Sequence, residues 1–236
     1  MVGPRTVEQL LQSLLDRYSD YPIYRDIGRV ETIYTDNQGR PKGVTRTLSN
    51  TTFIRDRGLR IEVQDCNKAS CPTHAVVTWF GGESRLWSHL NPDWRVEASL
   101  ELAIATAVGL SNGVALYVPS LLLPDLIASQ PIRTLTNLVR LDDEQMDGQV
   151  CCRLMGEWKQ AANTSQDVIQ MDTHEVDITP SYRQYQSDPV VLWIDGQANL
   201  LRGIDLGCKY PDLHITTTIR YSPNCPSVIS DDVFIL

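Results

Sequence analysis

The hydrophobic positions of the chain change their period after the first twenty residues. Leu10, Leu14 and Leu15 recur at helical spacing, and Thr6 stands where a helix cap is expected. From residue 24 onwards, short runs of alternating apolar and polar residues are separated by turn residues, as in antiparallel strands. The pattern therefore predicts an amphipathic helix over 6–18, followed by a strand-rich chain.

The predicted strands fall into two groups, one on each side of an apolar central stretch. Turn signals such as those at 36–39, 81–82 and 195–196 separate neighbouring strands. We expect strands at 24–34, 44–54, 59–63, 75–80, 135–141, 150–158, 167–174, 190–194, 200–206 and 213–221.

The central stretch 102–124, LAIATAVGLSNGVALYVPSLLLP, has no charged residue. It is long enough to cross a bilayer, but the turn cluster at 109–113 and Pro119 interrupt it. We therefore expect two short apolar helices joined by a bend. The first begins at 93 or 94 and ends at Gly109, and the second begins at Pro119.

These patterns predict an α+β fold in a single domain, 1–236. The chain has 236 residues, with no linker, low-complexity run or fixed repeat. We expect a large curved antiparallel sheet, with the N-terminal helix and the central helical insert covering one face.

Charge and cysteine content bear on partners and compartment. A net charge of −8 without a basic stripe argues against nucleic acid, because phosphate binding needs clustered Lys and Arg. No signal peptide begins at Met1, so we expect either a cytosolic protein or a mature chain with an added Met. The even number of cysteines, six, mildly favours the second, in an oxidising compartment, although six free thiols in the cytosol would be ordinary.

The cysteines leave several pairings open. Cys66 and Cys71 bracket a short turn between two strands, so they are the candidate disulfide. Cys151 and Cys152 are neighbours on one strand and point to opposite faces, which argues against a bond between them. Cys208 and Cys225 pair either together or with that doublet.

Candidate catalytic and metal sites are weak in this sequence. The four histidines are scattered, and no nucleophile–base, zinc or phosphate-loop motif occurs. The carboxylates at 142–144 with Asp147 lack the alternation of a calcium loop, which favours a solvated strand–loop surface. We therefore expect no enzyme activity, no metal and no cofactor.

Three short stretches resemble a known protein family. The segment 53–63, FIRDRGLRIEV, resembles the F-x-R-P-x-x-F-R-W strand pair of bacterial outer-membrane lipoprotein carriers. The segment 80–87, FGGESRLW, is similar to their D-G-x-x-L-W hairpin. The segment 191–202, VLWIDGQANLLR, is similar to their L-W-I-D-x-x-x-x-L-x-R hairpin. All three occur in the family's order, so the chain resembles a divergent member of the LolA/LppX-like superfamily.

The chain departs from the family motifs at three positions. Leu59 stands for the aromatic residue, Asp56 for the proline and Gly81 for the aspartate. The resemblance implies a half-barrel whose concave face is closed by helices and which binds acyl chains or lipidated proteins. It also implies a periplasmic or cell-envelope protein, peripheral to the membrane, with an envelope protein as a further partner.

The resemblance and the apolar insert together give a set of candidate site residues. The predicted apolar cavity and its cover are lined by Trp79, Trp87, Leu100, Ile104, Val108, Leu121, Leu122, Leu123, Leu192 and Trp193. The candidate latches of the cover are Arg55, Arg57 and Arg60, with solvated edge charges as the equal alternative.

Three functions remain open at this point. The leading hypothesis is a carrier or sensor of a hydrophobic ligand in the cell envelope. The alternative is a protein-interaction module whose interior is filled by its own side chains and binds no ligand. The third is an enzyme on a β scaffold, which a pocket with convergent, perturbed titratable groups would favour.

Overall fold

The structure is a computed structural model that describes residues 5–158, 186–224 and 226–234. The first part of the chain forms α1 (Val7–Asp20), β1 (Ile23–Thr35), β2 (Pro41–Ile54), β3 (Gly58–Asp65), β4 (Thr73–Phe80), β5 (Glu83–Ser88) and β6 (Asn91–Glu97). The remainder forms α2 (Leu100–Leu110), α3 (Val114–Leu122), β7 (Leu135–Met146), β8 (Gln149–Trp158), β9 (Gln186–Ser187), β10 (Val190–Asp195), β11 (Leu201–Lys209) and β12 (His214–Tyr221).

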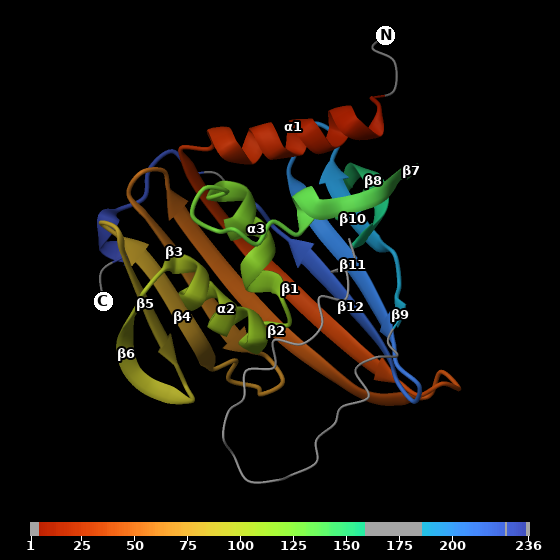
Figure 1. Ribbon diagram of the computed structural model, residues 1–236, viewed down its shortest axis with the longest axis horizontal. Helices are drawn as coiled ribbons and strands as arrows, with labels where there is room; N and C mark the ends of the chain where they lie inside the picture. Colours follow the sequence, from red (N-terminus) through yellow and green to blue (C-terminus); the bar gives the residue numbers. More distant parts are fainter. Residues whose placement is uncertain (1–4, 159–185, 225, 235–236) are drawn as a thin grey trace, which may run out of the picture.

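The strands make one antiparallel sheet, and all three helices lie on one of its faces (Figure 1). Eleven strands follow the order β6-β5-β4-β3-β2-β1-β12-β11-β10-β8-β7, and β9 pairs with β11. The first half meanders outward from β1, and the second half meanders back inward to β12, which pairs with β1 at the centre. The sheet is not closed, because β6 and β7 are its two edges.

The sheet curves around the helices. Helix α1 contacts the edge strand β7, and helix α2 contacts the opposite edge strand β6 as well as β4 and β5. The inward-facing side chains of the strands and the buried faces of the helices form one apolar core. The predicted α+β fold, a curved antiparallel sheet covered by an N-terminal helix and a central helical insert, is confirmed.

Local sequence explains where the helices begin. Thr6 caps α1 in a capping box with Gln9, each side chain bonding to the backbone of the other. Ser99 accepts a hydrogen bond from the backbone of Leu102 at the start of α2. Gly113 has a φ of 89°, and it sets the bend from which α3 departs.

Two predicted boundaries in the central region are wrong. Residues 93–97 belong to the edge strand β6, and the first helix begins only at Leu100. Every residue of β6 before Glu97 is exposed, so neither side of this strand is buried. The second helix begins at Val114 rather than at Pro119, which lies buried inside it.

The predicted disulfide between Cys66 and Cys71 is not formed, because both residues are free thiols. Backbone hydrogen bonds close this turn instead, from Cys71 N to Lys68 O (3.0 Å) and from Asp65 N to Pro72 O (2.9 Å). Burial and the neighbouring Cys71 thiol raise the pKa of Cys66 to about 11.

The remaining cysteines described by the structure are also free thiols. Cys152 belongs to the apolar core, whereas Cys151 is buried outside that cluster, as expected for neighbours on one strand. Cys225 and the predicted strand 167–174 lie outside the described residues. Within the described ranges, no helix is long and apolar enough to cross a membrane.

Gly28 lets α3 approach the sheet closely. A Cβ at this position would lie 2.9 Å from Cγ2 of Val114 and 3.1 Å from Cε1 of Tyr221. We expect Gly28→Ala to lower the free energy of unfolding, measured by urea denaturation, by about 1–3 kcal/mol through overpacking. The matched control is Gly43→Ala in β2, where the nearest atom is 3.9 Å away. Equal losses in the two variants would contradict this packing role.

Candidate functional site

The cover is the pair of helices α2 and α3, which lies on the inner face of the sheet. Leu100 and Ile104 of α2 are buried in the core, as are Leu121, Leu122 and Leu123 at the end of α3. Leu192 of β10 faces them from the sheet side of the same core, and Trp79 and Val108 pack against it while partly buried. The structure thus brings eight of the ten predicted cavity residues into one apolar layer.

Trp87 and Trp193 lie outside this layer. Their neighbours Leu86 and Leu192 occupy the inner face, and successive strand residues point to opposite faces. The Trp193 ring lies between the guanidinium groups of Arg153 and Arg220, 5.0 and 5.3 Å from its centroid. The two tryptophans therefore face away from the cover.

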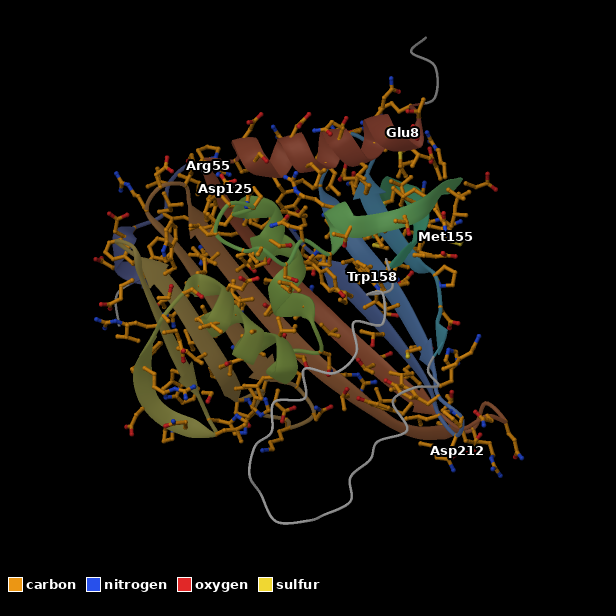
Figure 2. All side chains as sticks on the ribbon, viewed as in Figure 1. Glu8, Arg55, Asp125, Met155, Trp158 and Asp212 are labelled. Carbon is orange, nitrogen blue, oxygen red and sulfur yellow. The ribbon has the colours of Figure 1, made fainter. Side chains whose placement is uncertain are left out.

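Arg55 joins the sheet to the C-terminal ends of two helices (Figure 2). Its Nε and Nη2 donate to the carbonyl oxygens of Tyr21 and Tyr18, both at 2.9 Å, at the end of α1. Its Nη1 donates to the carbonyl oxygen of Leu122, the last residue of α3, at 3.3 Å. The last carbonyl groups of a helix have no donor in the following turn of that helix, so a cation is favoured there.

The other two latch candidates contact different groups. Arg57 donates to the carboxylate of Asp231 at 3.0 Å, next to the C-terminus. Arg60 lies 3.6 Å from Glu62 on the same strand. Of the three arginines, Arg55 is the one that reaches helix carbonyls.

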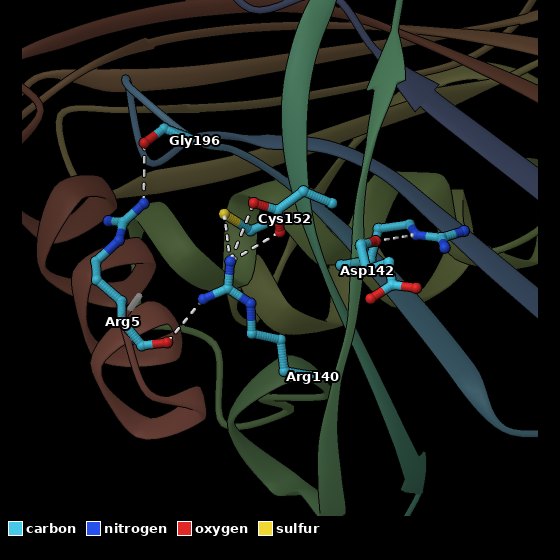
Figure 3. Close-up of polar contacts among 7 residues, drawn as sticks. Arg5, Arg140, Asp142, Cys152 and Gly196 are labelled. Carbon is cyan, nitrogen blue, oxygen red and sulfur yellow. Dashed lines mark hydrogen bonds and ion pairs between the residues drawn. The ribbon is translucent and has the colours of Figure 1, made fainter. Parts of the chain in front are cut away.

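The N-terminal end of α1 is also tied to the sheet (Figure 3). Arg5 donates to the carbonyl oxygen of Gly196 at 2.9 Å, in the turn between β10 and β11. Arg140 of β7 donates to the carbonyl oxygen of Arg5 at 2.7 Å. Because Arg55 holds its other end, α1 is anchored at both ends across the strands.

The cover is attached to the sheet more loosely than α1. Its side-chain hydrogen bonds to the sheet include Arg55 to Leu122 and Asn112 Nδ2 to Thr45 Oγ1, and both measure 3.3 Å. Tyr117 of α3 stacks on Trp158 of β8 with ring centroids 6.2 Å apart. Apolar packing therefore supplies most of the attachment.

A buried polar network interrupts the apolar layer beneath the helices. Asp26 is only 4% exposed and lies on the inner face of β1. The Tyr24 hydroxyl donates to Asp26 Oδ2 at 2.9 Å, and the Tyr18 hydroxyl of α1 lies 3.2 Å from that of Tyr24. The network thus links α1 to the centre of the sheet.

Three buried oxygens around this network have no hydrogen-bond partner among the described residues: Asp26 Oδ1, Ser49 Oγ and the Tyr221 hydroxyl. Ser49 and Tyr221 flank Gly28 on the neighbouring strands β2 and β12, two residues from Asp26. An unsatisfied buried polar group costs about 1–3 kcal/mol. The floor of the apolar layer therefore offers polar atoms to a partner.

Burial controls the protonation of this network. It raises the pKa of Asp26 from 3.8 to about 7, although the neighbouring Thr51 and the hydrogen bond from Tyr24 act in the opposite direction. Burial also raises the pKa of Tyr221 well above its usual range, and the nearby Asp26 charge adds to that effect. Asp26 therefore changes protonation near neutral pH, in a chain position that the sequence analysis did not single out.

The acidic run at 142–144 is paired with arginines. Asp143 Oδ1 lies 2.8 Å from Arg140 Nη2, and Glu144 forms an ion pair with Arg153. Within the described ranges, no group of three or more His, Cys, Asp or Glu side chains is arranged to hold a metal ion. Of the histidines, His74 and His89 stack at 3.9 Å, and His174 lies outside the described residues.

No family model matches the chain, and no curated protein matches it. Among solved structures it is similar to lipoprotein LppX of Mycobacterium tuberculosis, with 13% identity, a TM-score of 0.44 and coverage of 95% of this chain and 100% of that chain. It is also similar to a LolA superfamily protein of Nitrosomonas europaea, with 10% identity, a TM-score of 0.35 and 99% of both chains covered.

A third similar structure is the Pseudomonas aeruginosa MucA/MucB complex, with 11% identity, a TM-score of 0.43 and coverage of 96% of this chain and 59% of that chain. All three TM-scores are below 0.5, so the proposals that follow rest on the residues of this chain. Its similar structures include LppX and a LolA superfamily protein, members of the superfamily that its three sequence signatures resemble.

Proposed function

We propose that the protein binds a hydrophobic ligand non-covalently between the sheet and the cover α2–α3, without catalysis. The observation that carries the proposal is the cover itself. It is a pair of apolar helices that packs on an apolar sheet face and whose hydrogen bonds from Arg55 and to Thr45 both measure 3.3 Å. Moving the cover exposes an apolar surface that an acyl chain can occupy in its place.

The energies are compatible with such an exchange. Burial of a chain of a dozen methylene groups contributes about 10 kcal/mol, at roughly 0.8 kcal/mol for each group. Loss of the two hydrogen bonds between cover and sheet costs about 1 kcal/mol each. The apolar contacts that the cover gives up are replaced by contacts with the ligand.

The unsatisfied oxygens favour a ligand that also carries a polar group. Asp26 Oδ1, Ser49 Oγ and the Tyr221 hydroxyl lie on the sheet floor beneath α3. A hydroxyl or amide group of the ligand can donate to them, whereas a pure hydrocarbon leaves them unpaired. An amphiphile, either a lipid or the acyl group of a lipidated protein, therefore suits the site.

A carrier or sensor role in the periplasm or cell envelope completes the proposal. The free thiols at Cys66 and Cys71 remove the cysteine argument for an oxidising compartment. Support for this location comes from the three sequence signatures. An envelope protein that delivers or receives the ligand is the partner that this role requires.

The proposal is tested with protein purified from its native host. Native mass spectrometry and lipid extraction are expected to show a bound amphiphile, and the delipidated protein is expected to bind a fluorescent fatty-acid analogue saturably. Leu102→Gln is the control, because Leu102 is exposed on the outside of the cover. Absence of both lipid and saturable probe binding would overturn the proposal.

One observation favours the alternative of a protein-interaction module. The edge strand β6 and the turn before it expose apolar side chains at an edge of the sheet, with Val96 of β6 65% and Leu90 of the turn 73% exposed. If the protein binds no lipid, we expect Val96→Lys to weaken its association with other proteins in a pull-down from the native host. Unchanged association would count against this alternative.

A further inference from the structure

A cavity of about 350 Å³ lies on the outer face of the sheet, opposite the helices. Three consecutive residues from each of β1 and β2, 25–27 and 50–52, form its floor. The chain after β12 closes one side through Ser222, Asn224 and Val233. Cavities that bind small molecules have volumes from about 300 Å³ upward, so this cavity is large enough for a small ligand.

The strand register gathers basic and neutral donors in this cavity. Arg25 on β1 pairs with Thr52 on β2, and Thr52 pairs with Arg60 on β3. One arginine therefore lies on each side of Thr52, on the same face of the sheet. Asn50 lies one row further along the same face, and Asn224 pairs with Arg25 from the opposite side.

Most of these donors are not used within the fold. Among the described residues, the side chains of Arg25, Asn50, Thr52 and Asn224 have no hydrogen-bond or ion-pair partner. Arg60 lies 3.6 Å from Glu62. Two acidic residues line the cavity, Glu62 and Asp26, and the Asp26 side chain is turned to the buried inner face of β1. On the outer face, two cations with hydroxyl and amide groups thus face a space together with the Glu62 carboxylate.

The C-terminal segment, which forms one wall of the cavity, is held on the sheet by two contacts. Asp231 accepts hydrogen bonds from Arg57 at 3.0 and 3.1 Å. Phe234 is buried and stacks on Phe80 with ring centroids 6.0 Å apart. These two contacts hold Val233 over the floor, so the cavity is preformed.

We propose that this outer-face cavity binds a phosphate group, with Arg25 and Arg60 contacting its oxygens from both sides and the Thr52 hydroxyl donating from the floor. Guanidinium groups match the oxygens of phosphate in paired hydrogen bonds. The additional hydroxyl and amide donors suit the several acceptor oxygens of a phosphate better than the two of a carboxylate. The site is separate from the apolar layer and does not depend on the hydrophobic ligand.

The test is titration of the full chain with inorganic phosphate, glycerol 3-phosphate and vesicles containing phosphatidic acid, by calorimetry and by sedimentation. We expect saturable binding of at least one of them, and Arg25→Gln and Arg60→Gln are each expected to weaken it about tenfold or more. Thr52→Val, of the same shape, is expected to weaken it less. Binding of glycerol 3-phosphate indicates a soluble ligand, and binding confined to vesicles indicates a lipid headgroup.

The matched control is Arg46→Gln, on the same face of β2 and paired with Glu31 at 2.8 Å. It removes the same charge outside the cavity and is expected to leave phosphate binding unchanged. Absence of saturable binding of all three probes, or equal weakening by Arg46→Gln and Arg25→Gln, would overturn the proposal. The Arg25→Gln variant is expected to bind the fatty-acid analogue normally, which separates this site from the proposed function.

Discussion

Replacement of Asp26 by asparagine is expected to make the protein more stable than the wild type above neutral pH. Burial raises the pKa of this carboxyl from 3.8 to about 7. Ionisation of the folded protein at about pH 8 therefore costs stability on the order of 4 kcal/mol. Asparagine keeps the acceptor for the Tyr24 hydroxyl and removes the charge.

Proton binding by Asp26 decides whether the free energy of unfolding rises or falls with pH. Between the unfolded pKa of 3.8 and the folded pKa of about 7, the folded state holds a proton that the unfolded state has lost. The free energy of unfolding therefore falls as pH rises through this window and levels off above it. Carboxyls with lowered pKa values, such as Asp195 and Asp65, titrate below this window and have the opposite slope.

The measurement is urea unfolding at several pH values between about 4 and 8. The curves of the wild type and Asp26→Asn are expected to approach each other at the acid end and diverge as pH rises. Asp125→Asn, at an exposed position after α3 (Figure 2), is the matched control and should follow the wild type. Parallel profiles for the wild type and Asp26→Asn would contradict a buried, ionising carboxyl.

The alternation of apolar and polar residues was sufficient to predict most of the sheet. β1 extends one residue beyond the predicted strand at each end, and the turn at 81–82 has the positive φ values that its glycines permit. The prediction failed at β6, an exposed edge strand whose alternating Trp94 and Val96 were assigned to a helix. The Val96–Leu100 spacing then resembled the start of a helix.

The site was predictable only in part. The leucines of the cover were identified because an uncharged stretch must be buried, and Arg55 was named together with two neighbours that bond elsewhere. The sequence analysis missed Asp26, although its side chain lies on the same inward-facing side of β1 as those of Tyr24 and Val30. Its burial depends on the helices that pack over that strand, through Tyr18 of α1 and Val114 of α3, which no local pattern indicates.

Loss of the Arg55 side chain is expected to have the second large effect, because three carbonyl oxygens at two helix ends lose their donor. Arg55→Gln should lower the free energy of unfolding by on the order of 3 kcal/mol, since hydrogen bonds to charged groups contribute about 1.5–3 kcal/mol each and glutamine replaces one at most. Arg55→Lys keeps the charge but not the geometry of the donors, so its free energy of unfolding should lie between those of the wild type and Arg55→Gln.

The same variant separates a latch from a purely structural residue. If Arg55 holds a movable cover, Arg55→Gln will bind the fatty-acid analogue faster than the wild type under conditions where both are folded, because closing the cover competes with ligand entry. Arg57 lies in the same turn and bonds to Asp231. Arg57→Gln should change the stability and the rate of probe binding much less than Arg55→Gln does. A destabilised Arg55→Gln with an unchanged rate of probe binding would mean that α2 and α3 are fixed core and that the ligand, if bound, enters elsewhere.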